Sequence, residues 1–148
     1  MWNRNKSTTL SLICTRIVIA AAFMTLFFVP KIVDFFIYRG TVEERGRTVV
    51  IICVYICLAI GECILYMLDR LLNNIQKEDI FISRNVSYLR GISWACFALC
   101  IPCLVITFYC QIFFFILLAA GFMGLILRVV KNVIEEAVAI KEENDYTV

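Results

Sequence analysis

A chain of 148 residues that is 62% hydrophobic and only 18% charged has more apolar side chain than one small soluble core can bury, so the excess must face lipid. Its net charge of +2 is small and its basic residues are scattered, which argues against direct binding of nucleic acid. We therefore expect an all-α integral membrane protein whose first partner is the lipid bilayer.

Four apolar stretches predict a bundle of four transmembrane helices with helical cytoplasmic extensions, because a helix satisfies its own backbone hydrogen bonds inside lipid. A stretch without Asp, Glu, Lys or Arg runs from Gly91 to Leu127. It is about twice the roughly 20 residues that one crossing requires, and it therefore supplies two of the helices. The spans are expected at about residues 12–36, 48–68, 89–108 and 112–127, within a single membrane domain covering residues 1–148.

The first predicted span contains two basic residues and a proline. Arg16 and Lys31 can extend their charged ends to opposite membrane interfaces, and Pro30 bends or ends the helix. The alternative is a cleaved signal peptide, for which Arg4 and Lys6 would form the basic n-region. Arg16 interrupts the apolar run, however, and leaves too short an h-region, so we expect a retained helix.

Basic residues lie mainly on one side of the predicted spans. That side carries Arg4, Lys6, Arg16, Arg70, Lys77, Arg84, Arg90, Arg128, Lys131 and Lys141. The other side carries Lys31, Arg39, Arg45 and Arg47. Because basic residues favour the cytoplasmic side, we expect both termini and the loop between the second and third spans to be cytoplasmic.

The residues after the fourth span predict an amphipathic helix at about 128–144. Its apolar stripe consists of Val129, Val130, Val133, Ile134, Ala137, Val138 and Ile140. On the polar side, Lys131 and Glu135 are four residues apart and can form an ion pair. The stripe either packs on the protein's own middle loop or on lipid headgroups, or it is a docking surface for another protein.

Seven of the eight cysteines lie inside predicted spans, and Cys110 lies in the short turn between the third and fourth, so a disulfide framework is not expected. The chain has no histidine, and an ionised thiolate is costly in lipid, so we expect no metal and no cofactor. Metal or redox chemistry is the alternative, but small side chains that let helix backbones approach closely explain the spacing better. The predicted packing seam consists of Cys53, Cys57, Gly61, Cys96, Cys100, Cys103, Ala120 and Gly124.

Glu62 is the acidic residue that lies well inside a predicted span. An ionised, isolated carboxylate at that depth would be costly, so we expect Glu62 to be protonated or paired. Arg16 and Arg128 lie at comparable depth, and a pair with one of them is the structural interpretation. The alternative is a proton or cation site, although no second acidic residue accompanies Glu62 within the membrane.

Two segments carry a family resemblance: FISRNVSYLRGISW at residues 81–94 and the ending GLILRVVKNVIEEAVAIKEENDYTV. They resemble domain-of-unknown-function family 2975, small bacterial inner-membrane proteins with four predicted helices, and the resemblance spans essentially the whole chain. The family's middle-loop pattern is matched by Phe81, Asn85, Leu89, Arg90 and Trp94. Ile80 replaces its usual proline and Arg84 its usual acid, so no role is carried over to those two positions.

The resemblance implies a multi-pass protein of the bacterial cytoplasmic membrane. Members of this family are often encoded beside a small Cro-type helix-turn-helix regulator, which implies a DNA-binding partner held at the membrane. We therefore expect a non-enzymatic protein that senses or anchors. Its expected partner surface consists of Lys77, Arg84, Asn85, Arg90, Glu135, Glu136, Glu142, Glu143 and Asp145.

The competing hypothesis is a small transporter or channel component that uses Glu62 and works as a homo-oligomer. An enzyme is the least expected class. The sequence has no histidine, no clustered pair of carboxylates within a predicted span and no glycine-rich phosphate loop.

Overall fold

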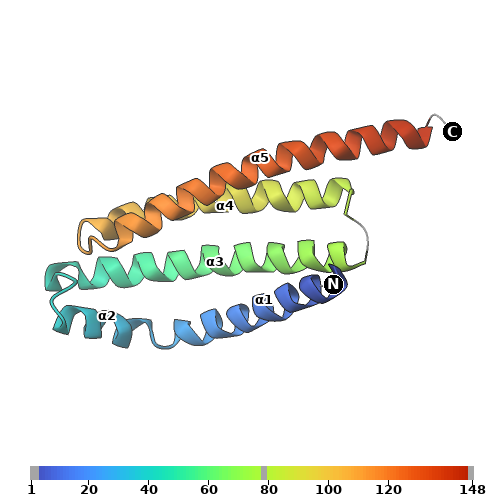
Figure 1. Ribbon diagram of the computed structural model, residues 1–148. Helices are drawn as coiled ribbons and strands as arrows, with labels where there is room; N and C mark the ends of the chain where they lie inside the picture. Colours follow the sequence, from blue (N-terminus) through green and yellow to red (C-terminus); the bar gives the residue numbers. More distant parts are fainter. Residues whose placement is uncertain (1–3, 78–79, 147–148) are drawn as a thin grey trace.

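The computed structural model describes the backbone of residues 4–77 and 80–146, and the side chains of residues 7–77 and 80–144. Within these ranges the secondary structure is entirely helical (Figure 1). The elements are α1 (Arg4–Leu26), α2 (Val29–Tyr38), the short 3₁₀ helix η1 (Glu44–Gly46), α3 (Arg47–Gln76), α4 (Ser83–Thr107) and α5 (Phe113–Tyr146).

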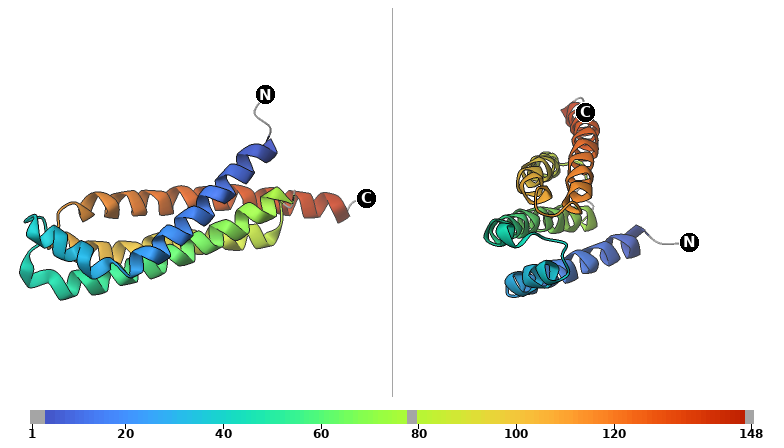
Figure 2. Two further views of the ribbon diagram at one scale, coloured as in Figure 1. Left: turned by 90° about the horizontal axis from the view of Figure 1, so that it is seen from below. Right: turned by 90° about the vertical axis from the view of Figure 1, so that its left-hand side faces the viewer.

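The helices pack as neighbours in chain order. α1 and α2 follow one another along α3, α3 packs on α4, and α4 packs on α5. The views in Figures 1 and 2 place α3 between the α1–α2 arm and the α4–α5 hairpin. α1 begins and α5 ends at the same end of the molecule, which we call the terminal end; the turns after α2 and α4 form the opposite end.

Four of the described helices are long and apolar enough to cross a membrane. Their outward surfaces are rich in exposed apolar side chains, including Ile101, Phe115 and Phe122. Such a surface suits lipid and not water. The predicted class, an all-α membrane protein with four membrane-crossing helices, is therefore confirmed.

Two ion pairs bracket the apolar zone. At the opposite end, Arg47 Nε lies 2.6 Å from Asp34 Oδ1 and joins α3 to α2. At the terminal end, Arg16 Nε lies 3.1 Å from Asp69 Oδ1 and joins α1 to α3. A rise of about 1.5 Å per residue separates Arg47 from Asp69 by roughly 33 Å along α3, close to the roughly 30 Å of a hydrocarbon core. The pairs therefore mark where α3 enters and leaves the bilayer.

The first predicted span, 12–36, is broken into two helices at Phe27 and Phe28. Pro30 has no N–H, so the carbonyl of Leu26 loses the donor that a continuous helix would supply. The hydroxyl of Tyr55 on α3 donates to that carbonyl instead, at 3.2 Å. The break is thus stabilised from the neighbouring helix.

A cluster of buried apolar residues lies between α2, α3 and the end of α4, in the half of the molecule near the opposite end. Its buried members include Val29, Val33, Val50, Cys53, Ile106 and Cys110. Because α2 reaches this core only through the break at Phe27 and Phe28, the break is part of how the arm packs. The core therefore anchors the end of the molecule that carries the short turns.

α5 continues without a break past the start of α4 and reaches beyond the other helices at the terminal end (Figure 1). The predicted apolar stripe divides there. Val138 is 6% exposed because it packs against the first turns of α4, whereas Val133 is 63% and Ile140 55% exposed. One part of the stripe therefore packs on the protein itself and the other faces outward.

Candidate functional site at the terminal end

The cysteines of the predicted seam lie at helix contacts, but not all at the same one. Cys57 and Cys103 join α3 to α4, with their sulfur atoms 3.9 Å apart. Cys100 faces α5, where its thiol lies 3.8 Å from the carbonyl of Leu117. All eight cysteines are free, and among the residues that the structure describes no three metal-ligating side chains are grouped to hold a metal ion.

The small residues of the seam differ in what they contact. Gly124 is buried against α4, and a Cβ built there would lie 3.3 Å from Cys96 Cβ. The hydroxyl of Ser93 donates to the Gly124 carbonyl at 2.8 Å, which fixes this close approach. Ala120 is half-buried on the same helix. A Cβ at Gly61 would meet nothing within 4 Å, so its predicted place in the seam is wrong.

Glu62 shares one face of α3 with Tyr55, Asp69 and Gln76, which repeat every seven residues. The other three all bond to α1, through the Leu26 carbonyl, Arg16 and Thr9 respectively. Their register places Glu62 beside the small side chains of residues 20–22, which offer no donor. Its buried Oε1 has no hydrogen-bond partner within the described part of the chain.

The predicted pairing of Glu62 with Arg16 or Arg128 is therefore not formed. Arg16 bonds to Asp69, about two turns nearer the terminal end. The guanidinium carbon of Arg128 lies 5.7 Å from the ring centroid of Trp94, a cation–π contact. Each arginine is thus held at the interface level and not drawn into the apolar zone.

A charge cluster links α4 to the extension of α5. Glu135 accepts hydrogen bonds from Lys131 Nζ at 2.6 Å and from Arg90 Nη2 at 2.9 Å. Glu135 lies beyond the apolar zone, and the hydrogen bond from Lys131 lowers the pKa of its carboxyl, an effect that the charge of Arg90 reinforces. The predicted pair of Lys131 and Glu135 is confirmed. Arg90 and Glu135, which were expected to face a partner, bond to each other within the protein.

Asn85 is misplaced by the sequence interpretation. It is 1% exposed and not part of a surface. Its Oδ1 accepts a hydrogen bond from Asn74 Nδ2 at 2.8 Å, and its Nδ2 donates to the Ile80 carbonyl at 2.9 Å. The helix that contains the third span begins at Ser83, before the predicted span at 89–108, and its first turns point Asn85 inward. Asn85 therefore ties the end of α3 to the start of α4.

The remaining members of the predicted partner surface are exposed. They are Lys77, Arg84, Glu136, Glu142 and Glu143, whereas the side chain of Asp145 lies outside the described residues. Glu142 accepts a hydrogen bond from Ser83 at 3.2 Å. A groove of about 300 Å³ runs between α4 and α5 there, lined by Ser83, Val86, Ser87, Arg90, Glu135, Val138, Ala139 and Glu142. The polar end of the molecule thus has a defined hollow as well as a charged surface.

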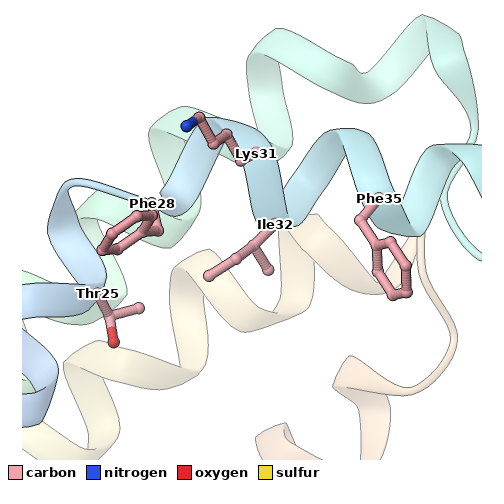
Figure 3. A pocket seen from close by; sticks show the side chains of 5 residues that line it. All are labelled: Thr25, Phe28, Lys31, Ile32 and Phe35. Carbon is pink, nitrogen blue, oxygen red and sulfur yellow. The ribbon is translucent and has the colours of Figure 1, made fainter.

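Two apolar hollows lie in the other half of the molecule. One, of about 400 Å³, is wide open at the helix break and is lined by Thr25, Phe28, Lys31, Ile32 and Phe35 (Figure 3). The other, of about 230 Å³, lies between α2, α3 and the start of α5 and is lined almost entirely by aliphatic and aromatic side chains. Both lie within the apolar zone, where lipid chains are available to fill them.

Sequence reasoning missed Tyr55, Asp69 and Ser93 as residues that hold neighbouring helices together. The seven-residue spacing of Tyr55, Glu62 and Asp69 was the available signal for the first two. Ser93 carries no signal of its own, because its partner is the backbone carbonyl of Gly124.

Comparison with known proteins gives one match. No curated protein and no solved structure is significantly similar to this chain. The family described as Protein of unknown function (DUF2975) matches residues 37–148, that is, from the end of α2 through α5, and leaves the first 36 residues outside the match. The chain belongs to this DUF2975 family.

Proposed function

We propose that this protein is a non-enzymatic membrane anchor or sensor of the bacterial cytoplasmic membrane, and that its terminal end binds a soluble cytoplasmic partner. The observation that carries this proposal is the position of Ile140. At about 1.5 Å per residue, Ile140 lies roughly 18 Å beyond Arg128, farther than the roughly 5–8 Å of headgroup region on each side of a bilayer. Its side chain is nevertheless 55% exposed.

The partner that fits this surface is basic. On the α5 extension Glu135, Glu136, Glu142 and Glu143 outnumber Arg128, Lys131 and Lys141. Glu135 and Glu142 also line the groove between α4 and α5, together with Arg90 of α4. Complementary charge steers association and selects partners. A DNA-binding protein has a basic surface of this kind. We therefore propose a small helix-turn-helix regulator as the partner, held away from DNA until a membrane signal releases it.

Binding of a purified small Cro-type helix-turn-helix regulator, taken from the source genome if one is encoded beside this chain, tests the proposal. We expect the full-length protein in detergent to bind it, and Ile140→Glu or Glu142→Lys to weaken binding at least tenfold. The matched control is Glu44→Lys, a change of the same charge at the opposite end, and this variant should bind the regulator as the wild type does. No binding by the wild type, or equal loss in Glu44→Lys, would refute the proposal.

A second candidate function, oligomeric transport, is favoured by one observation: the buried Oε1 of Glu62 without a hydrogen-bond partner among the described residues. A carboxyl of this kind within a membrane is a candidate site for a proton or a cation. Flux of protons or alkali cations into proteoliposomes, abolished by Glu62→Gln in a protein that folds normally, would support it.

A further inference from the structure

A small polar hollow lies between α4 and α5 where the hairpin leaves the apolar zone. It has a volume of about 90 Å³ and is lined by Arg90, Ser93, Trp94, Arg128 and Lys131. At roughly 30 Å³ per water molecule this is room for about three waters. The hollow therefore has the size of one small polar group, not of a sugar or a nucleotide.

The lining of this hollow is strongly cationic. Arg90, Arg128 and Lys131 contribute positive charge, and the acidic side chain that reaches them is Glu135. Glu135 is shared between Arg90 and Lys131, so the cluster keeps an excess of positive charge. Arg128 forms no ion pair with any described residue; its guanidinium rests on the Trp94 ring. Its hydrogen-bond donors therefore remain available to an anion.

The hollow sits at the level of the membrane interface. Arg90 and Arg128 directly flank the uncharged stretch from Gly91 to Leu127, so they mark where the hairpin leaves the hydrocarbon core. Trp94 is 61% exposed beside them, and tryptophan is enriched at this depth of a bilayer. Lipid phosphate groups lie at the same level, and basic pockets between membrane helices bind lipid headgroups.

We propose that this hollow binds the phosphate group of an anionic phospholipid from the leaflet at the terminal end. Arg128 donates to the phosphate oxygens in the forked geometry that a guanidinium offers, and Lys131 and Arg90 supply the remaining charge. The Trp94 ring orients Arg128 and lies against the glycerol end of the lipid. Bound there, the lipid bridges α4 and α5 just before α5 extends beyond the membrane.

Trp94 provides a direct probe of occupancy. Trp2→Phe leaves Trp94 as the remaining tryptophan, because the chain contains two. Two kinds of vesicle are compared: brominated phosphatidylglycerol with plain phosphatidylcholine, and plain phosphatidylglycerol with brominated phosphatidylcholine. Quenching of the Trp94 fluorescence in each reports which lipid lies beside this residue. We expect a preference of about fivefold or more for phosphatidylglycerol, because a basic side chain near the surface contributes about that factor.

Three variants in this background make the test specific. Arg128→Gln should lower the ratio of phosphatidylglycerol to phosphatidylcholine beside Trp94 toward one, whereas Arg128→Lys should retain most of the preference. Arg45→Gln removes an equal charge at the opposite end and should leave the preference unchanged. Helix content measured by circular dichroism verifies that each variant folds. A wild-type preference near one, or a preference that survives Arg128→Gln, would overturn the proposal.

A further arm distinguishes lipid from free phosphate. Glycerol 3-phosphate is added to vesicles with brominated phosphatidylglycerol, against sodium chloride of the same ionic strength. Equal quenching in both salts supports the lipid as the source of the phosphate. If glycerol 3-phosphate displaces the brominated lipid while chloride does not, the hollow binds soluble phosphate esters and the lipid assignment is wrong.

Discussion

The hydroxyl of Tyr55 donates to the carbonyl of Leu26, which Pro30 has left without its helical donor. In lipid an unsatisfied backbone carbonyl is costly, since no water is available to bond to it. The side chain of one helix thus repairs the backbone of another. This bond also fixes where α1 ends relative to α3.

We expect Tyr55→Phe to lower the free energy of unfolding by about 1 kcal/mol, the typical value of a hydrogen bond between membrane helices. Reversible unfolding in mixed detergent micelles measures the change. Tyr66→Phe is the matched control, because the hydrogen bond of the Tyr66 hydroxyl within the described residues is to Arg70 on its own helix.

A double-mutant cycle tests why Tyr55→Phe lowers the free energy of unfolding. Pro30→Ala restores an N–H that can bond to the Leu26 carbonyl, so Tyr55→Phe should cost much less in that background. Equal costs with and without Pro30 would show that the hydroxyl does not act through this carbonyl.

Gly124 and Gly61 form a second matched comparison. We expect Gly124→Ala to destabilise the protein by about 1–2 kcal/mol, because its Cβ would crowd Cys96 and Phe97 on α4. Gly61→Ala should be neutral or stabilising by about 0.5–1 kcal/mol, since its Cβ meets open space and alanine favours a helix. The same unfolding measurement checks both, and a larger loss at Gly61 would contradict the packing seen here.

Composition and periodicity were sufficient to predict the four membrane-crossing helices, because each depends only on the local density of apolar residues. The partners of the polar residues depend on more. The sequence interpretation paired Arg16 with Glu62 because the two residues lie at a similar depth. The Tyr55 contact at the helix break fixes the register of α1 against α3, and in this register Arg16 lies beside Asp69. A bond between a hydroxyl and a backbone carbonyl has no signature in a single sequence.

The two glycines illustrate the same limit. The small-residue pattern identified Gly61 and Gly124 alike, since both have a small residue four positions away. Only Gly124 faces a neighbouring helix. Which way a small residue points depends on helix rotation, and in a segment that is apolar on all sides nothing in the sequence reports that rotation. Asn85 was misassigned for a related reason, because the rotation of the first turns of α4 decides that its side chain points inward.

Asn85 is expected to be the most sensitive polar position of the terminal end. Asn85→Ala leaves Asn74 and the Ile80 carbonyl without their shared partner in a buried setting, at a cost of about 1–3 kcal/mol. The connection from α3 to α4 should loosen, so trypsin should cleave after Lys77 or Arg84 faster than in the wild type. Ser87→Ala, on an exposed position of the same helix turn, should leave the cleavage rate unchanged.

Replacing the two acidic residues of α3, Glu62 and Asp69, is expected to change the free energy of unfolding in opposite directions. Asp69→Asn should lower the free energy of unfolding by about 0.5–1 kcal/mol, the range for a pair as exposed as Arg16 and Asp69. Glu62→Met should instead raise it by about 1 kcal/mol, because it removes a buried oxygen that has no hydrogen bond among the described residues. In an Arg16→Gln background the effect of Asp69→Asn should disappear while that of Glu62→Met persists. If Arg16→Gln abolished the effect at Glu62 instead, Arg16 would pair with Glu62 in the membrane, and the register of α1 against α3 described here would be wrong.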